Sequence, residues 1–315
     1  MGAFNENLQI IRDIVHGVSM EGFKEKPMEV LPRVADYVLG LEDGTKRFAN
    51  ASLALSKAYA LVNSQPRAIA NREEVAFYQA IRAMLAKQVK PSVNLTNAER
   101  ELAIKQALAN GIVPEGVIDV FKAAGLEHPN IGLLSEQFLN EIRNMKERNL
   151  AAEALARLLK GNITARFKTN IIKNVLFSDL IQDALDRYAN RSIETAQLIE
   201  ELIALAKKLN DDIAKGNPDD LTDNEVAFYD ALEANEAAVR LMTHEDLVRL
   251  AQELTKKVRE NVKIDWSVRE STQAALRVMV RNLLDKYGYP PDFAKEAVET
   301  VVKQAELLTD EWLGG

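Results

Sequence analysis

A basic run without a single acidic residue lies near the middle of the chain. Residues 154–178, ALARLLKGNITARFKTNIIKNVLFS, hold five basic side chains: Arg157, Lys160, Arg166, Lys168 and Lys173. Such a face can neutralise phosphates and release their counterions, so the run predicts sequence-independent contact with duplex DNA through Arg166, Lys168 and Lys173. A solvated helix surface, balanced by acids elsewhere in the fold, explains the same run, and the sequence leaves both interpretations open.

The residue types that carry catalysis do not fall into any catalytic pattern. No stretch has the Gly-x4-Gly-Lys-Ser/Thr order of a phosphate-binding loop, and there is no cysteine. The histidines His16, His128 and His244 are far apart and outside any metal-binding motif. Neither Pro-Asp pair, at 218–219 and 291–292, leads into the acid-x-Lys of a metal-dependent nuclease. We therefore expect no catalytic residue, no metal site and no cofactor in this chain.

One of only two tryptophans stands directly before a helix start signal, in NVKIDWSVRE at 261–270. Ser267 with Glu270 fits a capping box, in which the hydroxyl and the carboxylate satisfy free backbone amides reciprocally. Trp266 then precedes the cap, where a hydrophobic residue staples onto the fourth helical position, but that position is Ser271. Trp266 must therefore pack against another element or anchor a protein partner, and both interpretations stay open.

Helical periodicity runs through nearly every segment, and no alternating run is long enough to indicate a strand. In 267–288 the predicted apolar stripe consists of Ala275, Val278, Met279, Leu283 and Tyr287. The opposite stripe consists of Glu270, Gln273, Arg277, Arg281 and Asp285. The prediction is an all-α fold, a multi-helix array of two packed helical subdomains without a significant sheet.

Capping boxes and glycines mark the expected helix ends. Thr96 with Glu99 and Thr222 with Glu225 fit the same box as Ser267 with Glu270. The expected helix stops are Gly161, Gly216 and Gly288.

Acids, Gly and Pro cluster where apolar periodicity fails, in LNDDIAKGNPDDLTD at 209–223. This boundary predicts a first helical subdomain at 1–210, a linker at 211–223 and a carboxy-terminal subdomain at 224–313. EVAFYQAI at 74–81 and EVAFYDAL at 225–232 match at six of eight positions, but their flanks do not align. We interpret them as two helices with similar packing.

Composition narrows the class of protein. The chain has 315 residues, 47% of them hydrophobic, which is enough for a sizeable core. The net charge of −7 argues against a surface that binds nucleic acid throughout. Residues 221–315 carry 12 basic against 18 acidic residues, a net of −6, and therefore suit a protein partner better than a phosphate backbone. The absence of cysteine and of any long apolar run indicates a cytoplasmic protein without membrane contact.

The segment NVKIDWSVRESTQAALRVMVRNLLDKYGYPPD, with QAE at 304–306, resembles the carboxy-terminal helical region of the R (motor and restriction) subunit of type I restriction–modification enzymes. DNEVAFYDALEANEAAV, RYANRSIETAQLIEELIALAK and SEQFLNEIRNMKERNLAAEAL are similar to the same region. The resemblance is strong over 222–310, good over 46–90 and 130–205, and weak over 1–45 and 91–129.

The resemblance implies a division of labour in the complete subunit. A nuclease domain and two motor lobes, which use ATP and Mg to translocate duplex DNA, would precede this region, so the parent would be an ATP-dependent type I site-specific deoxyribonuclease. The helical region itself is associated with docking onto the methyltransferase core of M and S subunits. We therefore expect an excised, non-catalytic assembly domain.

Trp266, Arg269, Arg277 and Arg281 are the candidate partner-binding residues, because an apolar anchor beside arginines is typical of protein interfaces. Arg281 and Asp285, four residues apart, could instead pair with each other. A module that contacts duplex DNA non-specifically beside the motor, and a free-standing helical scaffold, are the alternatives.

Overall fold

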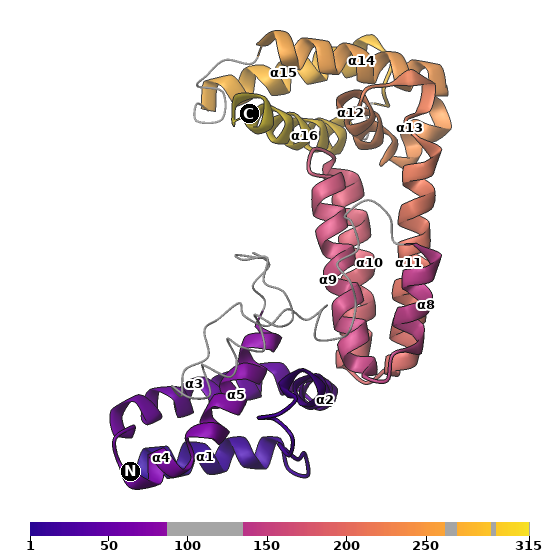
Figure 1. The fold of residues 1–315 in the computed structure, drawn as a ribbon. Helices are drawn as coiled ribbons and strands as arrows, with labels where there is room; N and C mark the ends of the chain where they lie inside the picture. The colour runs from indigo at the N-terminus through magenta and orange to yellow at the C-terminus, as the bar shows by residue number, and fades with distance from the viewer. Residues whose placement is uncertain (87–134, 262–269, 291–293, 315) are drawn as a thin grey trace. The chain divides into compact units, whose positions relative to one another are not determined.

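The structure, a computed structural model, describes residues 1–86, 135–261, 270–290 and 294–314 (Figure 1). This described part contains fourteen α-helices, one short 3₁₀ helix and no strand, which confirms the predicted all-α fold. The helices are α1 (Gly2–Ile14), α2 (Pro27–Gly40), α3 (Gly44–Val62), α4 (Pro66–Ala70), α5 (Arg72–Leu85), α8 (Glu136–Asn144), α9 (Arg148–Arg166), α10 (Ile171–Ala189), α11 (Thr195–Lys215), η1 (Pro218–Asp220), α12 (Asp223–Glu233), α13 (Glu236–Leu241), α14 (His244–Asn261), α15 (Glu270–Lys286) and α16 (Ala294–Gly314).

The chain divides into two compact units. Unit 1 comprises residues 1–157 and 184–203, and unit 2 comprises residues 158–183 and 204–315. Each unit has its own hydrophobic core.

The predicted linker at 211–223 is partly helical. Its first five residues, 211–215, form the last turn of α11, which ends at Gly216 with a φ of +68°. This left-handed conformation suits glycine and agrees with the predicted stop. The subdomain limits 1–210 and 224–313 stay a prediction.

Unit 1 is built on α1, α3 and α5, with α2 packed against the latter two. Phe4, Leu8 and Ile11 lie on one face of α1 and are at most 3% exposed, as a helical period of 3.6 requires. The rings of Phe23 and Phe77 meet edge to face, with centroids 4.8 Å apart. Aromatic contacts of this kind add to the free energy gained from burying the rings.

A part-buried asparagine on α9 joins several helices of unit 1. The Asn149 amide nitrogen donates to the backbone oxygen of Asp36 at 3.2 Å. Its amide oxygen accepts hydrogen bonds from the Tyr188 hydroxyl at 2.6 Å and the Thr195 hydroxyl at 2.8 Å. Four helices (α2, α9, α10 and α11) therefore meet at one side chain within unit 1.

Unit 2 is organised around α12, which packs against α14 and α16, while α15 covers α16 and α14 (Figure 1). Phe228, Leu250 and Val301 are fully buried between these helices. The predicted capping box at the start of α12 is confirmed: the Thr222 hydroxyl accepts from the Glu225 amide, and the Glu225 carboxylate accepts from the Thr222 amide at 2.8 Å.

The two similar segments occupy corresponding roles in different units. Residues 74–81 lie on α5 and residues 225–232 on α12, and each places a buried phenylalanine, Phe77 or Phe228, in its own core. This agrees with the interpretation that they are two helices with similar packing.

One predicted helix stop is wrong and another is confirmed. Gly161 lies inside α9, and a methyl group built there meets nothing within 4 Å. A helix interior tolerates glycine at a cost of about 1 kcal/mol relative to alanine, so a lone Gly is an ambiguous stop signal. Gly288, with φ +70°, does end α15, and the next amide, of Tyr289, donates back to Leu284 at 2.9 Å. The predicted caps at Thr96 and Ser267 lie outside the described residues.

The predicted apolar face of α15 is partly right: Leu283 is buried, and Met279 and Tyr287 are partly buried against the core of unit 2. The residues of α15 that face the core are Leu276, Val280, Leu283 and Leu284. Ala275 is exposed, Val278 is 57% exposed, and Met279 is only partly buried. Because α15 carries apolar side chains on two sides, periodicity alone cannot decide which side faces α14 and α16.

Candidate docking surface on α14 and α15

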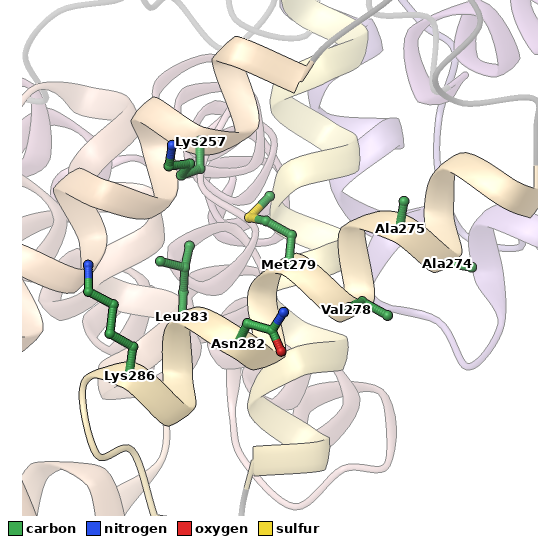
Figure 2. Close-up of a pocket in the computed structure, with 8 residues that line it drawn as sticks. All are labelled: Lys257, Ala274, Ala275, Val278, Met279, Asn282, Leu283 and Lys286. Atoms are coloured by element: carbon green, nitrogen blue, oxygen red, sulfur yellow. The ribbon is translucent and has the colours of Figure 1, made fainter.

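The second apolar side of α15 borders an open groove in unit 2. The groove has a volume of about 620 Å³ and is lined by Lys257 of α14 and by Ala274, Ala275, Val278, Met279, Asn282, Leu283 and Lys286 of α15 (Figure 2). Its lining is mainly apolar and includes no carboxylate. We call this feature the α15 groove.

Two lysines flank the apolar residues of the α15 groove. The Lys257 ammonium lies 3.2 Å from Glu260, and both side chains are nearly half exposed. The Lys286 ammonium lies 2.9 Å from Glu253, which also accepts a hydrogen bond from the Tyr287 hydroxyl at 2.6 Å. These bonds, that of Tyr287 first and that of Lys286 second, lower the pKa of Glu253.

The structure describes two of the four predicted partner-binding residues. Trp266 and Arg269 lie outside the described residues. Arg277 and Arg281 are exposed on α15, and no ion pair holds either of them within the part of the chain that the structure describes. The alternative pairing of Arg281 with Asp285 is therefore absent among the described residues.

The predicted DNA-contact residues lie near a different region of unit 2, the turn between α9 and α10. Arg166 and Lys168 are exposed there. The Lys173 ammonium instead lies 3.0 Å from Asp212 and 5.8 Å from the centre of the Phe167 ring, with 24% of its side chain exposed. Lys173 therefore stabilises the fold, and contact with duplex DNA through these three residues stays a prediction.

Lys173 belongs to a set of buried and half-buried polar residues that we call the polar joint: Asn170, Lys173, Asp212, Asp230 and Gln304. The Asn170 side chain caps α10 by accepting from the Lys173 amide at 3.0 Å, and it donates to Asp230 at 2.5 Å. Burial raises the pKa of Asp230, and the hydrogen bond from Asn170 and the charge of Lys173 only partly oppose that effect.

Gln304 completes the polar joint from α16. It is fully buried, donates to the backbone oxygen of Thr169 at 2.5 Å, and accepts from the backbone amide of Ile171 at 3.0 Å. These contacts lie more than 130 positions apart in sequence, and no local pattern could have indicated them.

The sequence carried a signal for the α15 groove, because four of its lining residues (Ala275, Val278, Met279 and Leu283) belong to the apolar stripe that was predicted to face the core. Its residues Ala274, Val278 and Asn282 are four apart, and Ala275, Met279 and Leu283 form a second row with the same spacing. With Leu276 and Val280 on the core side, α15 has more apolar surface than one buried face requires. Such an excess is typical of a helix that contacts a second protein.

No cluster of three or more metal-ligating side chains occurs among the described residues. In the same part of the chain, no helix is long and apolar enough to cross a membrane.

The comparisons with known proteins agree with one another. The model of the family described as "Type I restriction enzyme HindI endonuclease subunit-like, C-terminal" matches residues 1–311. The chain is 35% identical over 273 residues to the type I restriction enzyme HindI endonuclease subunit of Haemophilus influenzae, covering 87% of this chain and 26% of that protein. It is 27% identical over 249 residues to the putative type I restriction enzyme MjaIXP endonuclease subunit of Methanocaldococcus jannaschii, covering 78% of this chain and 24% of that protein.

The chain spans about a quarter of the length of the curated relatives it matches. No solved structure matches it significantly. Because the family model covers nearly the whole chain, the protein belongs to the family of HindI-like type I restriction endonuclease subunits, of which it represents the C-terminal region.

Proposed function

We propose that this chain docks the endonuclease subunit of a type I restriction enzyme onto the methyltransferase core of M and S subunits. The observation that carries the proposal is the exposed side of α15. It combines the α15 groove with two arginines, Arg277 and Arg281, that no ion pair holds within the described residues. Apolar surface beside arginine is the composition that protein interfaces favour.

The parent subunit would carry the chemistry. Its other regions would use ATP and Mg to translocate duplex DNA and would cut it, and this chain would supply no catalytic group. The chain's role is then to hold the motor at the methyltransferase, which recognises the target sequence.

Binding of the purified chain to a purified M–S core tests the docking role directly. We expect a complex at micromolar concentration by size-exclusion chromatography and calorimetry. Charge reversal of Arg277 and Arg281 to Glu together weakens it about tenfold or more, since each arginine would lose a partner carboxylate or carbonyl.

Charge reversal of Lys295 and Lys303, both exposed on α16, is the matched control and leaves affinity within about twofold. The absence of any complex between the wild-type chain and the M–S core at these concentrations would refute the docking role.

A further inference from the structure

The α15 groove has dimensions that suit a helix. Its lining follows two parallel rows on α15, one from Ala274 to Lys286 and the other from Ala275 to Leu283. The twelve-residue separation between Ala274 and Lys286 corresponds to about 18 Å of α-helix, or a little over three turns. A partner helix that places apolar residues at three- and four-residue steps would run along these rows for its full contact length.

The polar groups at the α15 groove favour such a partner over a small ligand. Small-molecule sites fix their ligand with several convergent, well-held polar groups. Here the only polar lining side chains are Asn282 and the two lysines, and Lys286 is 60% exposed. The apolar lining side chains include Val278, Met279 and Leu283, of which Met279 and Leu283 lie on the side of α15 toward Lys257, while Val278 points away from them (Figure 2).

The charge at the groove is opposite to that of the surrounding sequence. Residues 221–315 carry a net charge of −6, yet the lining contains two lysines and no acid, and α15 exposes Arg277 and Arg281 against one acid, Asp285, in the same stretch. A cationic rim within an acidic region attracts carboxylates and repels basic segments.

Both lysines can exchange their present partners at low cost. The pair Lys257–Glu260 is 42% and 46% exposed, and Lys286 is 60% exposed in its pair with Glu253. Exposed pairs of this kind contribute little to stability, so an incoming carboxylate can displace the internal one.

We propose that the α15 groove receives an amphipathic helix of about three turns from the methyltransferase core, apolar toward Val278 and Met279 and carrying carboxylates where it meets Lys257 and Lys286. This inference rests on the proposed docking function and names the surface and the chemistry of the partner segment.

Affinity for the M–S core, measured by calorimetry on the chain and its variants, tests the groove. Val278→Glu places a charge in the apolar lining of the groove and weakens binding at least about tenfold. Lys257→Glu with Lys286→Glu weakens binding to a similar extent and reduces its sensitivity to ionic strength.

The matched controls change equally exposed residues of unit 2 away from the groove. Val239, on α13, is 47% exposed against 57% for Val278, so Val239→Glu controls for adding a charge. Lys295→Glu with Lys303→Glu controls for double charge reversal. Both controls bind within about twofold of wild type, and circular dichroism confirms that every variant is folded.

A photo-crosslinking amino acid at position 278 identifies the occupant. We expect cross-links to one helical segment of M or S that carries acidic residues, and a synthetic peptide of that segment competes with the core. A basic or non-helical cross-linked segment overturns the proposal, as does self-association of the chain that Val278→Glu abolishes, because the occupant is then a second copy.

The two proposals fail in different ways. If the wild-type chain does not bind the core, the docking function fails, and the groove proposal fails with it. If the wild-type chain binds but the Val278 and lysine variants bind as tightly as their controls, docking stands and the groove proposal alone is wrong.

Discussion

Gln304 offers the sharpest test of how unit 2 is held together. Within the residues that the structure describes, its amide is the one hydrogen-bond partner of the backbone oxygen of Thr169 and of the backbone amide of Ile171. Gln304→Leu keeps nearly the same volume but leaves both part-buried backbone groups without this side-chain partner. An unsatisfied buried donor or acceptor costs about 1–3 kcal/mol, and since these two groups are part-buried we expect the free energy of unfolding to fall by about 2–4 kcal/mol.

The measurement is urea unfolding followed by tryptophan fluorescence, because both tryptophans belong to the sequence of unit 2. Gln252→Leu, at an exposed position of α14, is the matched control and changes the free energy of unfolding by less than about 0.5 kcal/mol. Hydrogen exchange gives a second readout: the Ile171 amide loses protection in Gln304→Leu and keeps it in the control.

Gln304→Glu separates the hydrogen bonds from the packing. An ionised carboxylate still accepts from Ile171 but repels the Thr169 oxygen, whereas the protonated acid can donate to that oxygen as the amide does. The folded-state pKa of this Glu is therefore raised above its unfolded value. The variant is most stable below the unfolded pKa of about 4.3 and loses stability as pH rises through the folded pKa. A Gln304→Leu variant as stable as wild type, with Ile171 still protected, would refute this reasoning.

Three further predictions concern other parts of the fold. Gly161→Ala raises the free energy of unfolding by about 0.5–1 kcal/mol, since Gly161 lies inside α9 with free space around it. Gly216→Ala lowers it by about 1 kcal/mol, because alanine disfavours the left-handed φ of +68°. Urea unfolding measures both changes. Asn149→Ala removes the acceptor of Tyr188 and Thr195 and destabilises unit 1 by about 2 kcal/mol, and amide exchange within unit 1 detects it; unchanged exchange would contradict the joining role. Because the pKa of Asp230 is raised, proton binding favours the folded state. The stability of wild type relative to Asp230→Asn is therefore greatest below about pH 4 and declines as pH rises through the folded pKa. A stability difference that does not change with pH would contradict the burial of Asp230.

The helical class and several helix ends could be predicted because their causes are local. The capping box of Thr222 and Glu225 spans four residues, and the stop at Gly288 depends on one left-handed residue and its neighbours. Gly161 shows the limit of such signals, since glycine interrupts a helix only where the backbone must leave the helical conformation.

The residues that fix the packing of each unit could not be predicted, because their partners are far away in sequence. Asn149 contacts Asp36 across 113 positions, and Asn170 contacts Asp230 across 60. From sequence alone, a polar residue on a helix is assigned to the solvent-exposed surface, because its tertiary partner is unknown. Burial and a hydrogen-bonded partner, which are tertiary properties, decide whether it stabilises a core.

The two apolar sides of α15 differ in whether the fold requires them. Leu276, Val280 and Leu284 are nearly or fully buried and complete the core of unit 2, so the fold requires them. Val278 is 57% exposed, and a polar residue there would cost the folded chain almost nothing. The fold therefore does not explain an apolar residue at position 278, whereas a partner helix does, because burying Val278 on binding supplies free energy that folding leaves unused.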